Sequence, residues 1–489
     1  MATAAVVLVQ VVPSFTELLA AAAQGARQLE EEGVLSLALP MPCRDPLALL
    51  PHLDDGGHFR FLWDGAPGLC LAASGTTHHL ELSGPRRFEL AQRFSAMSLS
   101  RLGQQPQSVP PLARPRVLLA FSFFDSPLQE TSAAVPGVQA VLPRWQLSRQ
   151  GRHCWLRLQR CLGGEVTPRS VAEELWERAR LLSRLPAEGE GWLPSTSRVG
   201  ITSRSCWESD YREAVRQALG LVEGGALRKL VVAVRQQVGL DQPLDPLELL
   251  ARLRRHQPGS CRFLWQQRPG DALIGASPER LLAVRQGQLR CDALAGTAPL
   301  GPPAEQLTQS TKDRHEHELV VEAITRVLSE AGLTPRRPRH PRLARHGKLV
   351  HLHTPITAAL TEHQPLALAE ALHPTPAVAG LPRREAMAWL RSLEPFERGH
   401  YAAPIGWIDS AGDAELRVAI RSGRLRGHCL ELTAGAGLVR GSEPERELQE
   451  VALKLGVLQQ QLNLSAPHPP RIAPSAGQQA ASTLHQTVG

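Results

Sequence analysis

The chain has 489 residues, of which 43% are hydrophobic and 21% are charged, and its formal net charge is +7. This length allows about three domains of roughly 150 residues each, or one large sheet-rich unit. No apolar run reaches the ~20 residues that cross a bilayer, and the first residues lack the basic segment of a secretory signal, so we expect a cytoplasmic protein with no membrane contact.

The first half, residues 1–185, alternates segments typical of strands with segments typical of helices. It contains no recognisable catalytic motif, and a polar break at 186–191 separates it from the rest. The patterns predict strands at 6–12, 59–63, 117–124 and 153–158, and helices at 88–102 and 171–185.

The second half, residues 192–463, begins with an amphipathic pattern that predicts a helix at 210–223, ended by Gly224 and Gly225. Strands are predicted at 230–234, 263–266 and 273–275. After residue 464 the composition turns to Pro, Ala, Ser and Gln, which indicates a disordered tail.

The segment at 312–318 predicts the start of a helix with a carboxylate on its buried face. Helical steps back from Val320 and Ala323 reach Glu316, while His315 and Glu322 fall on the outer face. A buried carboxylate is costly unless it is paired, and a hard cation is one suitable partner. The alternative for this segment alone is a solvated run of charge.

A second acidic helix is predicted from Pro444, after a glycine-rich segment at 434–437 that we interpret as a turn. Its spacing places Glu447, Glu450 and Lys454 on one stripe with Val451. Two helices that direct carboxylates inward could hold a divalent ion together. Oxygen ligands, without a His or Cys set at zinc spacing, favour Mg²⁺.

An arginine- and proline-rich run occupies 335–342, and such a run can bind nucleic acid. Aromatic residues make up only 4% of the chain, so we expect a solvated loop and no nucleic-acid partner.

The eight cysteines are scattered without a CxxC pair, which indicates reduced thiols rather than disulfides or zinc.

Taken in order, the motifs of residues 200–460 resemble the chorismate-utilising enzymes, and among them isochorismate synthase. The segments that carry the resemblance are 227–235, 277–281, 293–297, 312–318, 351–355, 373–378, 394–396, 419–421, 434–437 and the acidic helix after Pro444. The resemblance implies an α/β fold of the α+β type, with a large antiparallel sheet sandwich wrapped by helices. It places the active site in a central cleft and makes residues 1–185 a scaffold.

The resemblance also implies a reaction, the Mg²⁺-dependent conversion of chorismate to isochorismate by water addition and hydroxyl loss. Lys229 matches the family's base and Glu279 its acid, while Glu316, Glu447 and Glu450 match the metal site. From the residues alone, a strand-end lysine and a turn-capping acid are equally good interpretations of the first two. The positions implied to bind substrate are Gly296, Thr297, His351, Tyr401, Arg421, Gly435, Ala436 and Lys454.

Related activities are distinguished by single positions. Anthranilate synthases typically carry glutamine at the position of Lys229, and aminodeoxychorismate synthases carry lysine at that of Ala295, so both are disfavoured. Salicylate synthase keeps the lysine and remains the alternative. A nucleic-acid-binding protein and a non-catalytic chorismate-binding scaffold are remote alternatives. We expect a monomer that serves menaquinone or phylloquinone synthesis, with a siderophore pathway as the alternative. One departure from the family is residues 298–301, which lack its arginine before the glycine.

Overall fold

The computed structural model describes residues 12–29, 33–53, 56, 58–65, 67–104, 109–128, 134–185, 199–360 and 364–462. The predicted break at 186–191, the tail after 464 and all of the predicted first strand except Val12 lie outside these ranges. None of the helices within them is long and apolar enough to cross a membrane.

The first half contributes four helices and seven strands within the described ranges. The five predicted segments of this half that are described occur as elements with ends shifted by a few residues, and the structure adds others. The elements are α1 (Phe15–Ala26), β1 (Val34–Met41), α2 (Pro46–Leu53), β2 (Arg60–Asp64), β3 (Cys70–Leu82), α3 (Arg87–Ser100), β4 (Leu102–Gln104), β5 (Arg116–Phe121), β6 (Val138–Gln150), β7 (His153–Cys161) and α4 (Pro168–Arg184).

The second half supplies the remaining elements, and the predicted helix at 210–223 corresponds to α5. In chain order they are β8 (Ile201–Arg204), α5 (Glu208–Glu223), β9 (Lys229–Leu240), α6 (Pro246–His256), β10 (Cys261–Arg268), β11 (Asp271–Ser277), β12 (Arg280–Arg285), β13 (Gln288–Pro299), α7 (Pro302–Gln306), α8 (Thr311–Glu330), β14 (Arg342–His346), β15 (Leu349–Ala359), α9 (Pro365–Leu372), β16 (Gly380–Leu381), α10 (Arg383–Leu393), β17 (Pro404–Asp409), β18 (Ala414–Val418), β19 (Ser422–Arg426), β20 (Cys429–Leu438) and α11 (Pro444–Gln459).

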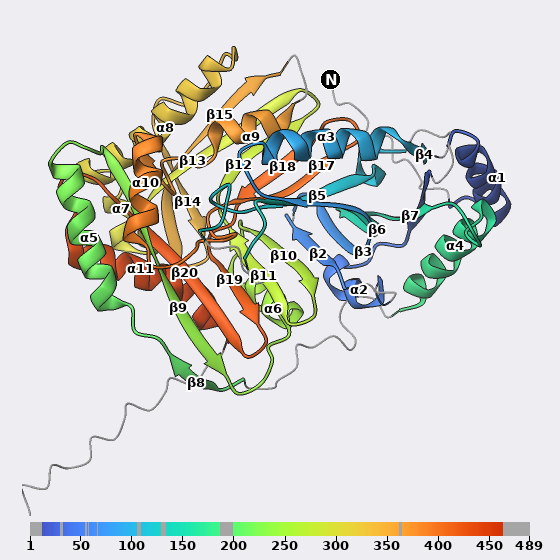
Figure 1. Ribbon diagram of the computed structural model, residues 1–489, viewed down its shortest axis with the longest axis horizontal. Helices are drawn as coiled ribbons and strands as arrows, with labels where there is room; N and C mark the ends of the chain where they lie inside the picture. The colour runs from blue at the N-terminus through green and yellow to red at the C-terminus, as the bar shows by residue number, and fades with distance from the viewer. Residues whose placement is uncertain are drawn as a thin grey trace, which may run out of the picture.

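Two arms of sheet extend from the long strand β6. Along one edge β6 pairs with β3, and the ladder continues through β2, β10, β11, β19, β20 and β9. Along the other edge it pairs with β5, and that ladder continues through β17, β18, β12, β13, β15 and β14. Every pairing in these two ladders is antiparallel, and each ladder contains strands of both halves of the chain (Figure 1).

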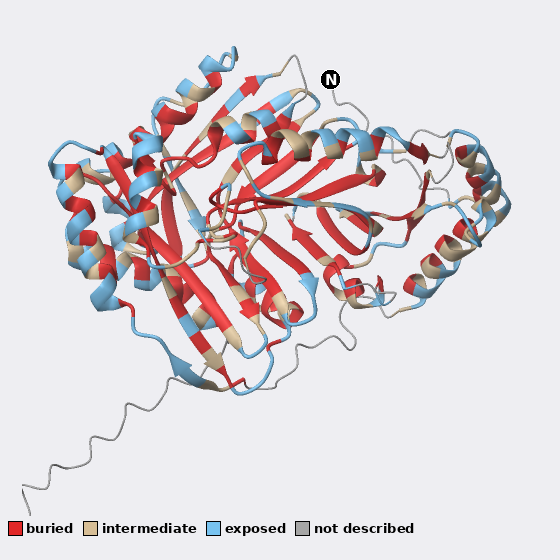
Figure 2. Ribbon diagram, viewed as in Figure 1, coloured by how far each residue is buried: buried red, intermediate tan, exposed pale blue. Residues whose placement is uncertain are grey.

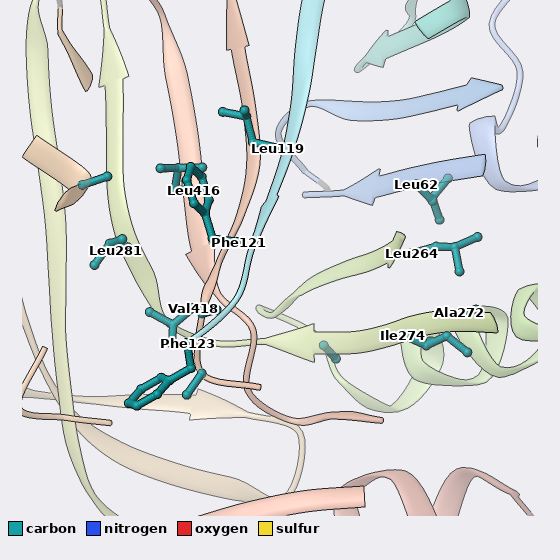
Figure 3. Close-up of a cluster of buried hydrophobic side chains, with 14 of the residues drawn as sticks. Leu62, Leu119, Phe121, Phe123, Leu264, Ala272, Ile274, Leu281, Leu416 and Val418 are labelled. Carbon is teal, nitrogen blue, oxygen red and sulfur yellow. The ribbon is translucent and has the colours of Figure 1, made fainter. Parts of the chain in front are cut away.

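The two arms bury apolar side chains between and around them. Figure 3 shows members of this core from both arms, including Leu62, Leu264 and Ile274 from one and Phe121 and Leu416 from the other. The strands are mostly buried along their length, while the helices expose one face (Figure 2). This arrangement confirms the predicted antiparallel sheet sandwich covered by helices.

The glycine-rich segment at 434–437 is not a turn, and this prediction is wrong. These residues lie inside β20, where Ala434 to Gly437 pair with residues of β9. Glycine in a strand interior often marks a close approach of another group. An added Cβ on Gly435 would lie 2.7 Å from the carbonyl oxygen of Val232, so the strand needs glycine there.

The two acidic helices form as predicted. Ser310 caps α8 by accepting a hydrogen bond from the backbone N–H of Asp313, and Pro444 occupies the first turn of α11. The arginine-rich segment between α8 and β14 is a largely exposed loop with one isolated strand bridge, between Arg336 and Thr357. Arg337 pairs with Glu318 at 2.9 Å.

Candidate active site

Lys229 begins β9 and has no exposed surface. Its Nζ lies 2.9 Å from Oε1 of Glu316, which α8 directs toward the core as the helical spacing predicted. Gly437 of β20 leaves room for this pair, because an added Cβ there would overlap Oε1 of Glu316 and lie 2.8 Å from Cε of Lys229. Three elements far apart in the sequence therefore meet at one buried ion pair.

Glu279 occupies the link between β11 and β12 and is 3% exposed. Its backbone N–H donates to Oγ of Ser277 over 3.2 Å. Burial raises the pKa of Glu279 to about 8, against the opposing effect of the charge on Lys229. The carboxyl group is therefore largely protonated at neutral pH, the form that a general acid requires.

The carboxylates predicted to bind metal are each paired with a lysine. Glu447 accepts from Nζ of Lys312 over 2.6 Å, and Glu450 pairs with Lys454 at the same distance. Glu447 is fully buried, and burial together with the charge of Glu450 raises its pKa to about 7. The negative charges of Glu450 and Glu316 both disfavour ionisation of Glu447, so this group of carboxylates needs positive charge nearby.

This donor set suits a hard divalent cation, since it consists of carboxylate oxygens that repel one another. As arranged here, the described residues contain no group of three or more His, Cys, Asp or Glu side chains disposed around a common metal position. The lysines supply the compensating charge instead. A bound Mg²⁺ would therefore require these side chains to reorient.

His351 of β15 faces Gly296 and Thr297 of β13. Its Nδ1 lies 3.1 Å from Oγ1 of Thr297 and 3.3 Å from the carbonyl oxygen of Gly296. A carbonyl oxygen only accepts, so we assign the proton to Nδ1, which leaves Nε2 as an acceptor. Burial lowers the pKa of His351 well below its usual value, so the ring is neutral.

Arg421 stands at the turn between β18 and β19 with a φ of +53°, a strained value for a residue with a side chain. It is 8% exposed, and its Nη1 has no hydrogen-bond partner among the described residues. Burial lowers its pKa to about 10. A buried guanidinium with an unused donor is suited to a carboxylate of a ligand.

One pocket collects most of the predicted site residues. Those that line it are Glu279, Gly296, Thr297, Glu316, His351, Tyr401, Arg421, Gly435, Glu450 and Lys454. Lys229 lies one contact behind the wall, through Glu316, whereas Glu447 is paired with Lys312, which does not line the pocket. Ala436 is buried and does not line the pocket.

Sequence reasoning missed some members of the site. Lys312 was noted only as part of a helix start, although its position next to an acidic helix is what a partner for Glu447 requires. Gly437 was included only in the supposed turn. The apolar wall also contains Val231, Leu294 and Ala377, which carry no distinctive sequence signal.

Comparison with known proteins gives consistent matches along nearly the whole chain. A family model described as chorismate binding enzyme matches residues 18–463. A salicylate biosynthesis isochorismate synthase of Pseudomonas aeruginosa is 32% identical over 452 residues, which cover 90% of this chain and 92% of that protein.

Solved structures agree with the sequence matches. MenF, the menaquinone-specific isochorismate synthase from Escherichia coli, superimposes with a TM-score of 0.72 and 26% identity, over 91% of this chain and all of that one. Anthranilate synthase component I from Streptococcus pneumoniae shares the fold, with a TM-score of 0.64 and 18% identity over 83% of this chain and 93% of that one. These similarities confirm the resemblance to isochorismate synthases found in the sequence, and the chain belongs to the chorismate-binding enzyme family.

Proposed function

We propose that this chain converts chorismate to isochorismate. The observation that carries the proposal is the buried carboxyl group of Glu279 at the pocket wall, whose pKa burial raises to about 8 within electrostatic range of Lys229. A protonated acid and a nearby amine are what the exchange of one hydroxyl for another requires. The relatives named isochorismate synthase support the same reaction.

In this mechanism each proton has a defined donor and acceptor. The amine of Lys229 takes a proton from water as the water oxygen bonds to one ring carbon. Glu279 gives its proton to the departing hydroxyl, which leaves as water while the ring double bonds shift. One water enters and one leaves, so the product is an isomer of the substrate.

The remaining residues hold the substrate in place. Arg421 has the unused donor for one substrate carboxylate, and Nε2 of His351 can accept from a substrate hydroxyl. Lys454 donates to the carbonyl oxygen of Gly435 over 2.7 Å, so its ammonium group is fixed at the pocket wall. Glu316, Glu447 and Glu450 would hold Mg²⁺, which would neutralise the second carboxylate.

Salicylate synthase remains the alternative, because that enzyme also carries a lysine at the position of Lys229. It eliminates pyruvate after isochorismate has formed. Chorismate incubated with the purified protein and Mg²⁺ is expected to give a chorismate–isochorismate mixture without pyruvate, measured by liquid chromatography with a parallel pyruvate assay. Salicylate with stoichiometric pyruvate would establish the lyase instead, and unchanged chorismate would contradict both.

Treatment with a chelator is expected to abolish turnover, and added Mg²⁺ to restore it. Full activity after chelation would contradict the metal site.

We further propose that the product serves quinone synthesis. The likeness to a menaquinone-specific synthase over 91% of this chain supports this role. Supply of salicylate synthesis is the alternative, because the similar Pseudomonas aeruginosa protein is named for it.

Gly437→Ala is expected to lower kcat/KM by about 100-fold while the protein still folds. The new methyl group would displace Glu316 and Lys229, and both are flexible side chains that can move. Overpacking of this kind costs about 1–3 kcal/mol of stability, whereas small displacements of catalytic groups can cost about 100-fold in rate. Steady-state kinetics and thermal unfolding would measure the two effects.

Gly220→Ala is the matched control, because an added Cβ there meets nothing within 4 Å. It should leave activity unchanged and, because alanine favours a helix over glycine, should raise stability by roughly 0.5–1 kcal/mol rather than lower it. If Gly437→Ala kept wild-type kcat/KM, the close packing of Lys229 and Glu316 would have no catalytic importance.

A further inference from the structure

A buried ion pair joins Glu394, directly after α10, to Arg398, four residues further along the chain. Nε of Arg398 donates to Oε2 of Glu394 over 2.7 Å, and Nη2 donates to Oε1 over 2.5 Å. Both side chains are almost completely buried. Such a pair adds little net stability, because both charges lose their hydration. Its further hydrogen bonds, all to backbone groups, show what it holds in place.

The ion pair completes one edge of β9, the strand that carries the proposed base. Along this edge β9 pairs with the two residues of β16, and the backbone N–H of Val231 donates to the carbonyl oxygen of Ala379 over 2.6 Å. Side chains bind the two backbone groups that follow. The carbonyl oxygen of Val231 accepts from Nη2 of Arg398 over 2.7 Å. The N–H of Ala233 donates to Oε1 of Glu394 over 2.8 Å. The pair thus satisfies buried backbone groups as a neighbouring strand would.

The same pair also holds two other segments of the active-site pocket. Nη1 of Arg398 donates to the carbonyl oxygen of Val378 over 2.7 Å. The carbonyl oxygen of Arg398 accepts from the N–H of Tyr401 over 2.9 Å. Val231, Val378 and Tyr401 all line the pocket, and the ion pair lies behind them. Glu394 and Arg398 therefore tie three parts of the pocket wall together.

A contact with the first half of the chain adds a fourth tie. The guanidinium of Arg398 lies 4.2 Å from the ring centre of Phe123, which follows β5. The carbonyl oxygen of Phe123 in turn lies 3.1 Å from Nε2 of His373, in the segment that leads to Val378. The scaffold half and the pocket wall thus meet at one side chain.

We propose that Glu394 and Arg398 are positioning residues of the active site, which hold the strand that carries Lys229 in place against the rest of the pocket wall. Side chains alternate along a strand, so Lys229 and Val231 share a face of β9, and a shift at Val231 also moves Lys229. The proposal rests on the proposed function, in which Lys229 takes a proton from water.

Arg398→Lys tests the proposal, because a single ammonium group cannot reproduce a planar fork that reaches one carboxylate and two carbonyl oxygens. A displacement of about 1 Å at a catalytic group can cost about 100-fold in rate, so kcat with chorismate is expected to fall about 10–100-fold while KM stays within about threefold. KM is expected to hold because Arg421 and His351 lie on other elements. Steady-state kinetics at a temperature well below unfolding would separate the two.

Glu394→Gln is the second variant, and it covers the case in which Arg398→Lys does not fold. The amide has nearly the same volume and keeps an acceptor for the N–H of Ala233, so the loss of kcat should have the same form but be smaller. Hydrogen exchange measured by mass spectrometry gives a readout without turnover. In both variants, exchange is expected to become faster in residues 229–233 and 375–379.

Arg262→Lys is the matched control. Arg262 of β10 is also buried, donates to the carbonyl oxygen of Ser260 over 2.6 Å and pairs with Asp64 at 2.8 Å, outside the pocket wall. This substitution should lower stability while kcat and KM remain those of the wild type.

Wild-type kcat in the folded variants of Arg398 and Glu394 would overturn the proposal, because the ion pair would then be structural only. An equal loss of kcat in Arg262→Lys would overturn it too, as would unchanged exchange at 229–233. A wild-type protein that did not convert chorismate would contradict the proposed function instead, and the exchange measurement would still show whether the ion pair holds β9.

Discussion

Glu279→Gln is expected to lower kcat/KM by about 10²–10⁴-fold, the usual contribution of a general acid. The amide occupies nearly the same volume but has no proton to give to the departing hydroxyl. Steady-state kinetics with chorismate and Mg²⁺ would measure the loss. Glu322→Gln makes the same chemical change at an exposed position of α8 and should leave the kinetics unaltered.

The same residue predicts a pH dependence. Because burial raises the pKa of Glu279 to about 8, wild-type turnover should fall as the pH rises through this value. The residual activity of Glu279→Gln should lack this limb. A wild-type profile that declined already above pH 5, where an ordinary carboxyl group is ionised, would contradict the assignment.

Stability should change over the same pH window. Between an ordinary pKa of 4.5 and about 8, the folded protein keeps a proton that the unfolded chain has released. The free energy of unfolding contributed by this group therefore decreases as the pH rises through the window. Urea unfolding at pH 6 and pH 9 should show Glu279→Gln gaining stability relative to the wild type at the higher pH.

Lys229→Gln is the second substitution with a large expected effect, again about 10²–10⁴-fold in kcat/KM. The amide can still donate a hydrogen bond to Glu316 but cannot take a proton from water. Loss of the positive charge also leaves a buried carboxylate less compensated, and breaking a buried pair costs up to about 3–5 kcal/mol. Kinetics and urea unfolding should therefore both change.

Arg228→Gln is the matched control, because the neighbouring Arg228 side chain is 60% exposed and its nearest carboxylate, Glu322, is 3.9 Å away. It should affect neither measurement. A Lys229→Gln protein that is destabilised but keeps wild-type kcat/KM when folded would show that Lys229 is only a structural partner of Glu316.

The faces of single helices could be predicted from the sequence. The helical repeat of 3.6 residues fixes which side chains share a face, so the burial of Glu316 and Glu447 followed from their spacing to Val320 and Val451. The pairing of Glu450 with Lys454 followed in the same way. These predictions needed no knowledge of the rest of the fold.

Contacts between distant elements could not be predicted in this way. The pair of Lys229 with Glu316 depends on how β9 packs against α8, and the bond from Lys312 to Glu447 on how α8 meets α11. Neither is a property of local sequence. The segment at 434–437 failed for a related reason, because glycines typical of turns serve in β20 to admit Glu316 and the carbonyl oxygen of Val232.

The shared sheet has a consequence for how the chain folds during synthesis. In the finished protein β5 pairs with β17, so this edge of β5 stays unpaired until residues 404–409 have been synthesised. Ribosomes add roughly 5–20 residues per second, so the intervening ~280 residues take roughly 15–60 s. An unpaired edge is a site of aggregation, and the nascent first half is therefore expected to depend on chaperones until the last strands emerge.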